Sequence, residues 1–136
     1  MKVYVAGQLA DKTAVADAQR AVLAAGHELT HDWAQDLEFT IDSASRPEEL
    51  AHIAQTDLTG VMAADAVVVH CVKSSAWTRT LRGTRRGARA GRDGLLRHVV
   101  AVGTIVHESV FYFHPRVRRV ATVREWLAEV ESHAAG

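Results

Sequence analysis

The stretch AVVVHCV, residues 66–72, decides the fold of this chain. It is a nearly unbroken run of small and β-branched apolar residues, with no polar alternation before His70. Such a run is typical of a central parallel strand that helices cover on both faces. We therefore predict an α/β fold whose mainly parallel sheet is built around residues 66–72.

Further strands and helices alternate around this central strand. The other predicted strands are KVYVA at 2–6, HELTHDW at 27–33, RHVVAV at 97–102 and an edge strand at 117–120, while VFYF at 110–113 is either a short strand or an aromatic plug. Helical spacing of apolar residues predicts a helix from a cap at Asp11 to Gly26, because glycine commonly ends helices.

Two more helices are predicted, and a third segment is harder to assign. Pro47 suits a helix start, and an apolar stripe then runs from Glu48 to Ala64. Thr122 caps a final helix. Residues 76–94 are rich in glycine and arginine and carry only a weak helical signal.

The alternation of strands and helices predicts a single domain over residues 1–136. The expected architecture is a flavodoxin-like or Rossmann-like three-layer sandwich with four to five mainly parallel strands. In such sheets, ligands bind outside the carboxyl ends of the strands. The residues at those ends include Gly7, Trp33, His70 and Gly103.

Composition narrows the function classes. The 136 residues include one cysteine, Cys71, so an intramolecular disulfide and a thiolate metal cluster are both excluded. The eight histidines do not show the tight spacing of a zinc site. No apolar run is long enough to span a membrane, and the N-terminus does not resemble a secretory signal. We expect a cytoplasmic protein with neither metal nor membrane association.

Charge is distributed unevenly along the chain. The net charge is zero, but residues 1–72 carry 4 basic and 11 acidic residues, whereas residues 73–136 carry 12 basic and 5 acidic ones. Seven arginines fall between Arg79 and Arg97. They form either a solvated face or a surface for phosphate groups, so an arginine-rich nucleic-acid-binding module is one alternative. The zero net charge and the scarcity of aromatic residues there argue against nucleic acid.

Three separated pieces carry a family resemblance: KVYVAG at 2–7, DLTGVMAADAVVV at 57–69, and Gly83-Thr84 before a run of small residues. Together they resemble the nucleoside 2-deoxyribosyltransferases and the related deoxynucleoside 5′-monophosphate glycosidases. The resemblance implies a flavodoxin-like sheet and cleavage or exchange of an N-glycosidic bond without a cofactor. It also implies a glutamate nucleophile in a Gly-Thr-x-x-Glu-x-Gly motif, which forms a glycosyl-enzyme intermediate.

The chain departs from that motif at the nucleophile. It has Gly87 where the glutamate is expected. The protein is then either a non-catalytic nucleotide-binding relative, or residues 76–94 are an altered reading of a stretch that once encoded the motif. A coding sequence that keeps every arginine of this stretch would exclude the second explanation. Glu108 is the substitute carboxylate that another loop could supply.

The resemblance also assigns roles to individual residues. Asp57 would orient the substrate or its sugar hydroxyl, against the alternative of a solvated helix acid. The Tyr4 hydroxyl would reach the cleft, although core packing of its ring explains the residue equally well. The resemblance also implies Gly7, Gln8, Gly83 and Thr84 as groups for a base or phosphate. Two more substrate-binding residues are predicted from their own chemistry and place in the chain: Trp33 for stacking on the base, and His70 beside the cleft, for which a hydrogen-bonded core histidine is the alternative. The expected partners are a small nucleoside or nucleotide and further copies of the chain in a homo-oligomer.

Overall fold

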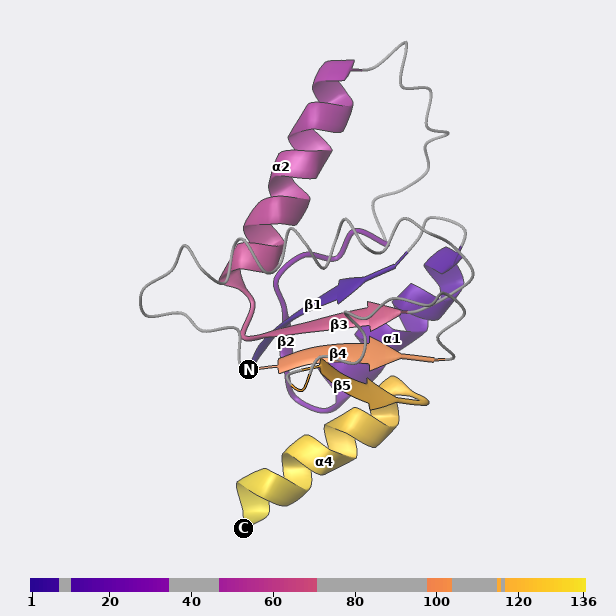
Figure 1. Ribbon diagram of the computed structural model, residues 1–136. Helices are drawn as coiled ribbons and strands as arrows, with labels where there is room; N and C mark the ends of the chain where they lie inside the picture. The colour runs from indigo at the N-terminus through magenta and orange to yellow at the C-terminus, as the bar shows by residue number, and fades with distance from the viewer. Residues whose placement is uncertain (8–10, 35–46, 71–97, 104–114, 116) are drawn as a thin grey trace.

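The computed structural model describes residues 1–7, 11–34, 47–70, 98–103, 115 and 117–136 (Figure 1). Its elements, in chain order, are β1 (Lys2–Ala6), α1 (Lys12–Ala24), β2 (Glu28–Leu29), α2 (Pro47–Ala63), β3 (Ala66–His70), β4 (His98–Val102), β5 (Val117–Val120) and α4 (Val123–Ala135). The predictions for residues 76–94 and 110–113 lie outside the described residues.

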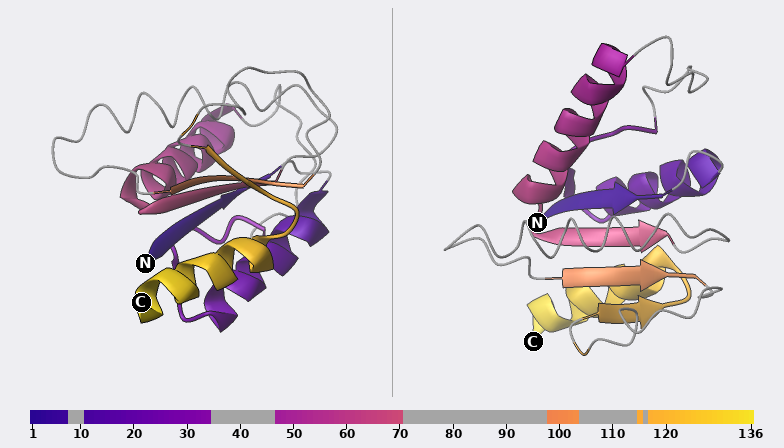
Figure 2. Two further views of the ribbon diagram at one scale, coloured as in Figure 1. Left: turned by 60° about the horizontal axis from the view of Figure 1, so that its bottom comes forward. Right: turned by 45° about the horizontal axis from the view of Figure 1, so that its top comes forward.

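The five strands form one sheet in the order β2-β1-β3-β4-β5, and every neighbouring pair is parallel. Helices α1 and α4 cover one face, and α2 lies on the other (Figure 2). This is a flavodoxin-like α/β sandwich, as predicted. Residues 117–120 form its edge strand, which confirms that assignment.

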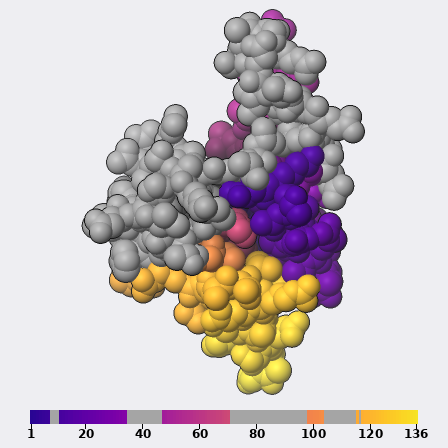
Figure 3. Space-filling model, turned by 90° about the vertical axis from the view of Figure 1, so that its right-hand side faces the viewer, coloured from indigo at the N-terminus to yellow at the C-terminus, as the bar shows by residue number. Residues whose placement is uncertain are grey.

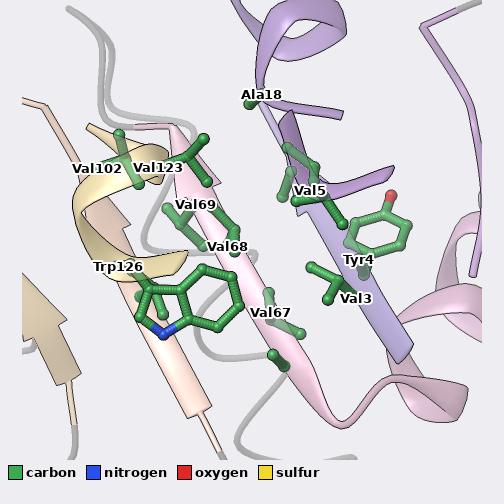
Figure 4. Close-up of a cluster of buried hydrophobic side chains, with 14 of the residues drawn as sticks. Val3, Tyr4, Val5, Ala18, Val67, Val68, Val69, Val102, Val123 and Trp126 are labelled. Atoms are coloured by element: carbon green, nitrogen blue, oxygen red, sulfur yellow. The ribbon is translucent and has the colours of Figure 1, made fainter. Parts of the chain in front are cut away.

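The core includes side chains on both faces of the sheet, and the α1–α4 layer covers one of these faces. Residues 66–69 of β3 are buried along their whole length, which explains the unbroken apolar run in the sequence. Trp126 of α4 packs against this face beside the valines of β3 (Figure 4). Helices α1 and α4 contact each other and lie side by side in the space-filling view (Figure 3).

The helix ends follow the sequence signals. Gly26 has a φ of +80° directly after α1, a backbone conformation that favours glycine. Asp11 occupies the N-cap position of α1, although its side chain makes no capping hydrogen bond. At α4, the Glu125 backbone N–H donates to Thr122 Oγ1 at 3.3 Å, and Glu125 Oε2 accepts from the Ala121 N–H at 2.9 Å. The cap at Thr122 is therefore confirmed.

The predicted second strand is much shorter than residues 27–33. Strand pairing ends at Leu29, and the Thr30 N–H then donates to the Val3 carbonyl at 3.0 Å. Further along, the Trp33 indole N–H donates to the Val5 carbonyl at 2.8 Å. The Trp33 side chain thus donates to a carbonyl group on the edge of β1 that the backbone of a longer β2 would otherwise have paired with.

The predicted apolar face of α2 is not buried as a stripe. Leu58 and Met62 are 45% and 59% exposed, and Gly60 is the only residue of the helix that is buried. The prediction of one apolar stripe turned away from solvent was therefore wrong for Leu58 and Met62. The helix approaches β1 through Gly60 near its C-terminal end and projects away from the sheet (Figure 1).

Candidate functional site

Three polar side chains from three segments meet on the α2 face of β1. The Tyr4 hydroxyl donates to Asp57 Oδ1 at 3.1 Å, and His31 Nε2 lies 3.6 Å from the same oxygen. Tyr4 comes from β1, Asp57 from α2, and His31 from the segment after β2. We call these three residues the Asp57 cluster.

The alternation of β1 places Tyr4 in this cluster. Val3 and Val5 point into the core, so Tyr4 points to the opposite face, and Figure 4 shows its ring on the side of β1 away from Trp126. The ring of Tyr4 is buried, as the core-packing alternative expects, while the reach of its hydroxyl into a substrate cleft stays a prediction. The contact of the hydroxyl is Asp57 itself.

Gly60 allows α2 to approach this closely. A Cβ atom at Gly60 would lie 3.1 Å from the His31 Cβ and 3.2 Å from the Tyr4 ring. Asp57 lies one turn earlier on the same side of the helix, since residues three and four apart share a face. The small residue thus brings the Asp57 carboxylate within reach of both partners.

The electrostatics of the cluster follow from partial burial. The Asp57 side chain is 36% exposed and that of His31 is 19% exposed. Burial raises the pKa of Asp57, while the Tyr4 hydrogen bond and the neighbouring His31 act in the opposite direction. Burial, followed by the charge and hydrogen bond of Asp57, raises the pKa of Tyr4 far above its usual range. Tyr4 is therefore a neutral donor, and Asp57 is a partly desolvated acceptor.

The raised pKa of Asp57 predicts a pH-dependent cost in stability. Below its ordinary value of 3.8, the group is protonated in both folded and unfolded chains and carries no such cost. As the pH rises towards the folded pKa, the unfolded chain releases the proton more readily, so stability is lost. We expect the Tm of Asp57→Asn, relative to the parent protein, to increase from about pH 4 upwards and then level off. Calorimetry across this range tests the sign, and a relative Tm that falls with pH would contradict it.

The carboxyl ends of β1 and β3 hold a second group of predicted residues. A Cβ at Gly7 would lie 3.8 Å from the His70 Cβ, so these two residues are neighbours at the point where strand order reverses. His70 Nδ1 is buried and has no hydrogen-bond partner within the part of the chain that the structure describes. This pair marks the edge at which doubly wound sheets bind ligands.

The two groups lie on opposite faces of the sheet. Tyr4 pairs with Val67, so Val69 shares its face, and His70 points to the α1 side. Of the predicted site residues that the structure describes, Tyr4 and Asp57 thus belong to the Asp57 cluster and Gly7 and His70 to the edge, while Trp33 belongs to neither.

Trp33 is a buried side chain beside β1, at the edge of the strand beyond the last residue of β2. It is 8% exposed, and its indole N–H is used by the Val5 carbonyl. The ring thereby covers the open edge of β1 beyond β2. Stacking of Trp33 on a base remains a prediction.

The other predicted site residues lie outside the described residues: Gln8, Gly83, Thr84, Gly87 and Glu108. Within residues 1–7, 11–34, 47–70, 98–103, 115 and 117–136, no group of three or more His, Cys, Asp or Glu side chains is placed to hold a metal ion. None of the helices described there is long and apolar enough to cross a membrane.

His31 was not predicted as a site residue. The sequence offered one signal, because His31 lies in the second half of the strand predicted at 27–33 and therefore near its carboxyl end. Its approach to Asp57 depends on the early end of β2 and on the small residue at position 60. Neither feature is visible in the strand periodicity.

Comparison with solved structures gives one informative match. The chain superimposes on a 2-deoxyribosyltransferase from the psychrotolerant bacterium Bacillus psychrosaccharolyticus with a TM-score of 0.66, over 93% of this chain and 90% of that one. The chain shares that transferase's fold. Sequence identity is 13%, so the relationship is one of fold. No protein-family model and no curated protein matches the sequence.

Proposed function

We propose that this protein binds a deoxynucleoside or its 5′-monophosphate and cleaves or exchanges the N-glycosidic bond. The observation that carries the proposal is the half-buried Asp57 carboxylate, whose Oδ1 accepts from the Tyr4 hydroxyl. A partly desolvated carboxylate on a helix that packs against the sheet is suited to accept a sugar hydroxyl. The fold shared with a 2-deoxyribosyltransferase supports the substrate class.

The proposed reaction requires a carboxylate nucleophile in addition to Asp57. Its attack on the anomeric carbon forms an ester bond and breaks the bond to the base, which leaves with the electron pair and takes up a proton. A second base or water then displaces the carboxylate. Glu108 is the proposed nucleophile, and Asp57 holds the sugar.

A non-catalytic nucleotide-binding protein is the second candidate. Gly87 stands where the resemblance expects the glutamate, and this observation favours binding without turnover. The Asp57 cluster would then hold the same ligand. The two candidates differ in turnover.

The test is incubation of the purified protein with each deoxynucleoside and deoxynucleoside monophosphate, with and without an acceptor base. Free base and exchanged nucleoside are followed by chromatography, and binding is followed by calorimetry. Asp57→Asn is expected to lower turnover by about 100-fold or more, because loss of substrate positioning costs this much. Asp17→Asn is the matched control, since Asp17 is an exposed acid of α1 that pairs with Arg20.

Three outcomes separate the candidates. Turnover that Asp57→Asn abolishes and Asp17→Asn retains supports the enzyme. Binding without turnover, again lost in Asp57→Asn, supports the nucleotide-binding protein. Neither binding nor turnover by the folded protein would reject both.

A further inference from the structure

Both contacts of the Asp57 carboxylate meet on one oxygen. Tyr4 donates to Oδ1, and His31 Nε2 approaches the same atom. The protein therefore holds the carboxylate at Oδ1, and the 36% of the Asp57 side chain that is exposed is available to a ligand.

His31 is held in place on both sides along the chain. The N–H of Thr30, directly before it, donates to the Val3 carbonyl, and the indole N–H of Trp33, two residues after it, donates to the Val5 carbonyl. These two bonds tie the segment to β1, and α2 packs against the His31 Cβ through Gly60. The imidazole is thus positioned by the fold, with 19% of its side chain exposed.

We infer that His31 is a positioning residue for Asp57: together with Tyr4 it holds Oδ1, so that the exposed part of the carboxylate keeps one orientation and accepts a hydroxyl group of the ligand. The neighbouring His31 also acts to lower the pKa of Asp57 and so favours the ionised carboxylate, which is the form that accepts hydrogen bonds without donating one. The identity of the hydroxyl as that of a deoxyribose rests on the proposed function. The positioning of Asp57 by His31 does not rest on that function.

The titratable groups that face His31 are few in the described part of the chain. Tyr4 faces it from β1 and Asp57 from α2, and Asp32 follows it directly in sequence. Tyr4 stays neutral because its pKa is raised. Among these groups of the described part of the chain, Asp57 is therefore the charged one whose side chain lies near the His31 ring.

The test is titration of the Asp57 side-chain carboxyl carbon by ¹³C NMR in the full chain without ligand. Because His31 lowers the pKa of Asp57, His31→Gln is expected to shift the Asp57 midpoint upwards. Tyr4→Phe should shift it in the same direction by removing the hydrogen bond. His52→Gln is the matched control, since His52 is an exposed histidine on α2, the helix that carries Asp57. The Asp57 midpoint in His52→Gln should equal that of the parent protein.

Folding is checked from the amide spectrum of each variant. An unchanged Asp57 midpoint in folded His31→Gln, or an equal shift in His52→Gln, would overturn the inference. Neither result would affect the substrate assay, in which the proposed function is judged by Asp57→Asn. Where a deoxynucleoside binds, His31→Gln should weaken its affinity by about tenfold, because hydrogen bonds that depend on a charged group are worth about 1.5 kcal/mol or more.

Discussion

Replacing Trp126 with alanine is expected to lower the free energy of unfolding by about 3–5 kcal/mol. Trp126 is 2% exposed and is the largest fully buried side chain of the described core. Its ring meets that of His98 edge-on, with centroids 6.1 Å apart and an interplanar angle of 63°. Removing it leaves a cavity between α4 and the sheet, which adds to the lost transfer free energy (Figure 4).

Denaturant unfolding followed by circular dichroism measures this loss. Glu131→Ala is the control, because Glu131 is exposed on the same helix and its replacement should change stability by less than about 0.5 kcal/mol. Trp126→Phe should fall between alanine and the parent protein. A loss below about 1 kcal/mol for Trp126→Ala would show that α4 contributes little to the core.

The sheet could be predicted because its strands carry their signal locally. The run at 66–69 is buried on both sides, and the alternation at 2–6 separates Val3 and Val5 from Tyr4. Glycine at position 26 and threonine at 122 mark helix ends through backbone freedom and capping, which are also local.

The sequence-based predictions of secondary structure and burial were wrong where tertiary contacts override local patterns. Residues 30–33 alternate like a strand, yet the Trp33 indole satisfies the β1 edge and ends the pairing. The apolar positions of α2 predict a buried stripe, yet the close approach at Gly60 decides which side meets the sheet and leaves Leu58 and Met62 exposed.

Only part of the candidate site could be predicted, because its residues come together through tertiary contacts. Tyr4 and Asp57 were singled out through the family resemblance, and the structure places them in hydrogen-bond contact. That they share a partner in His31 depends on three segments far apart in sequence. The division between the Asp57 cluster and the Gly7–His70 edge follows from strand register, which the sequence alone does not specify.

Gly7→Ala is expected to destabilise the protein by about 1–3 kcal/mol, because the added methyl overpacks the turn between β1 and α1. An alanine Cβ at this position would clash with Val15 Cγ2, far inside any real contact distance. Val15 is fully buried and β-branched, so its methyl has little freedom to move. Backbone shift of the turn is the remaining relief.

A double-mutant cycle isolates this contact. Val15→Ala alone should cost about 1.5–3 kcal/mol from two lost methyl groups and the cavity they leave. In Gly7→Ala/Val15→Ala the clash is gone, so the double variant should be more stable than the sum of the single losses by about 1 kcal/mol. Gly26→Ala is the control partner, since it is strained by its φ of +80° but has nothing within 4 Å of the added Cβ. The stability losses of Gly26→Ala and Val15→Ala should therefore add in the double variant.

The cycle also separates two reasons for a glycine at position 7. If Val15 is the reason, the double variant recovers stability and retains ligand binding. If the backbone of Gly7 must also approach a base or phosphate at the carboxyl edge, the double variant recovers stability and still loses affinity. Strict additivity of Gly7→Ala and Val15→Ala would instead show that the turn absorbs the methyl without contact to α1, and would remove the packing argument.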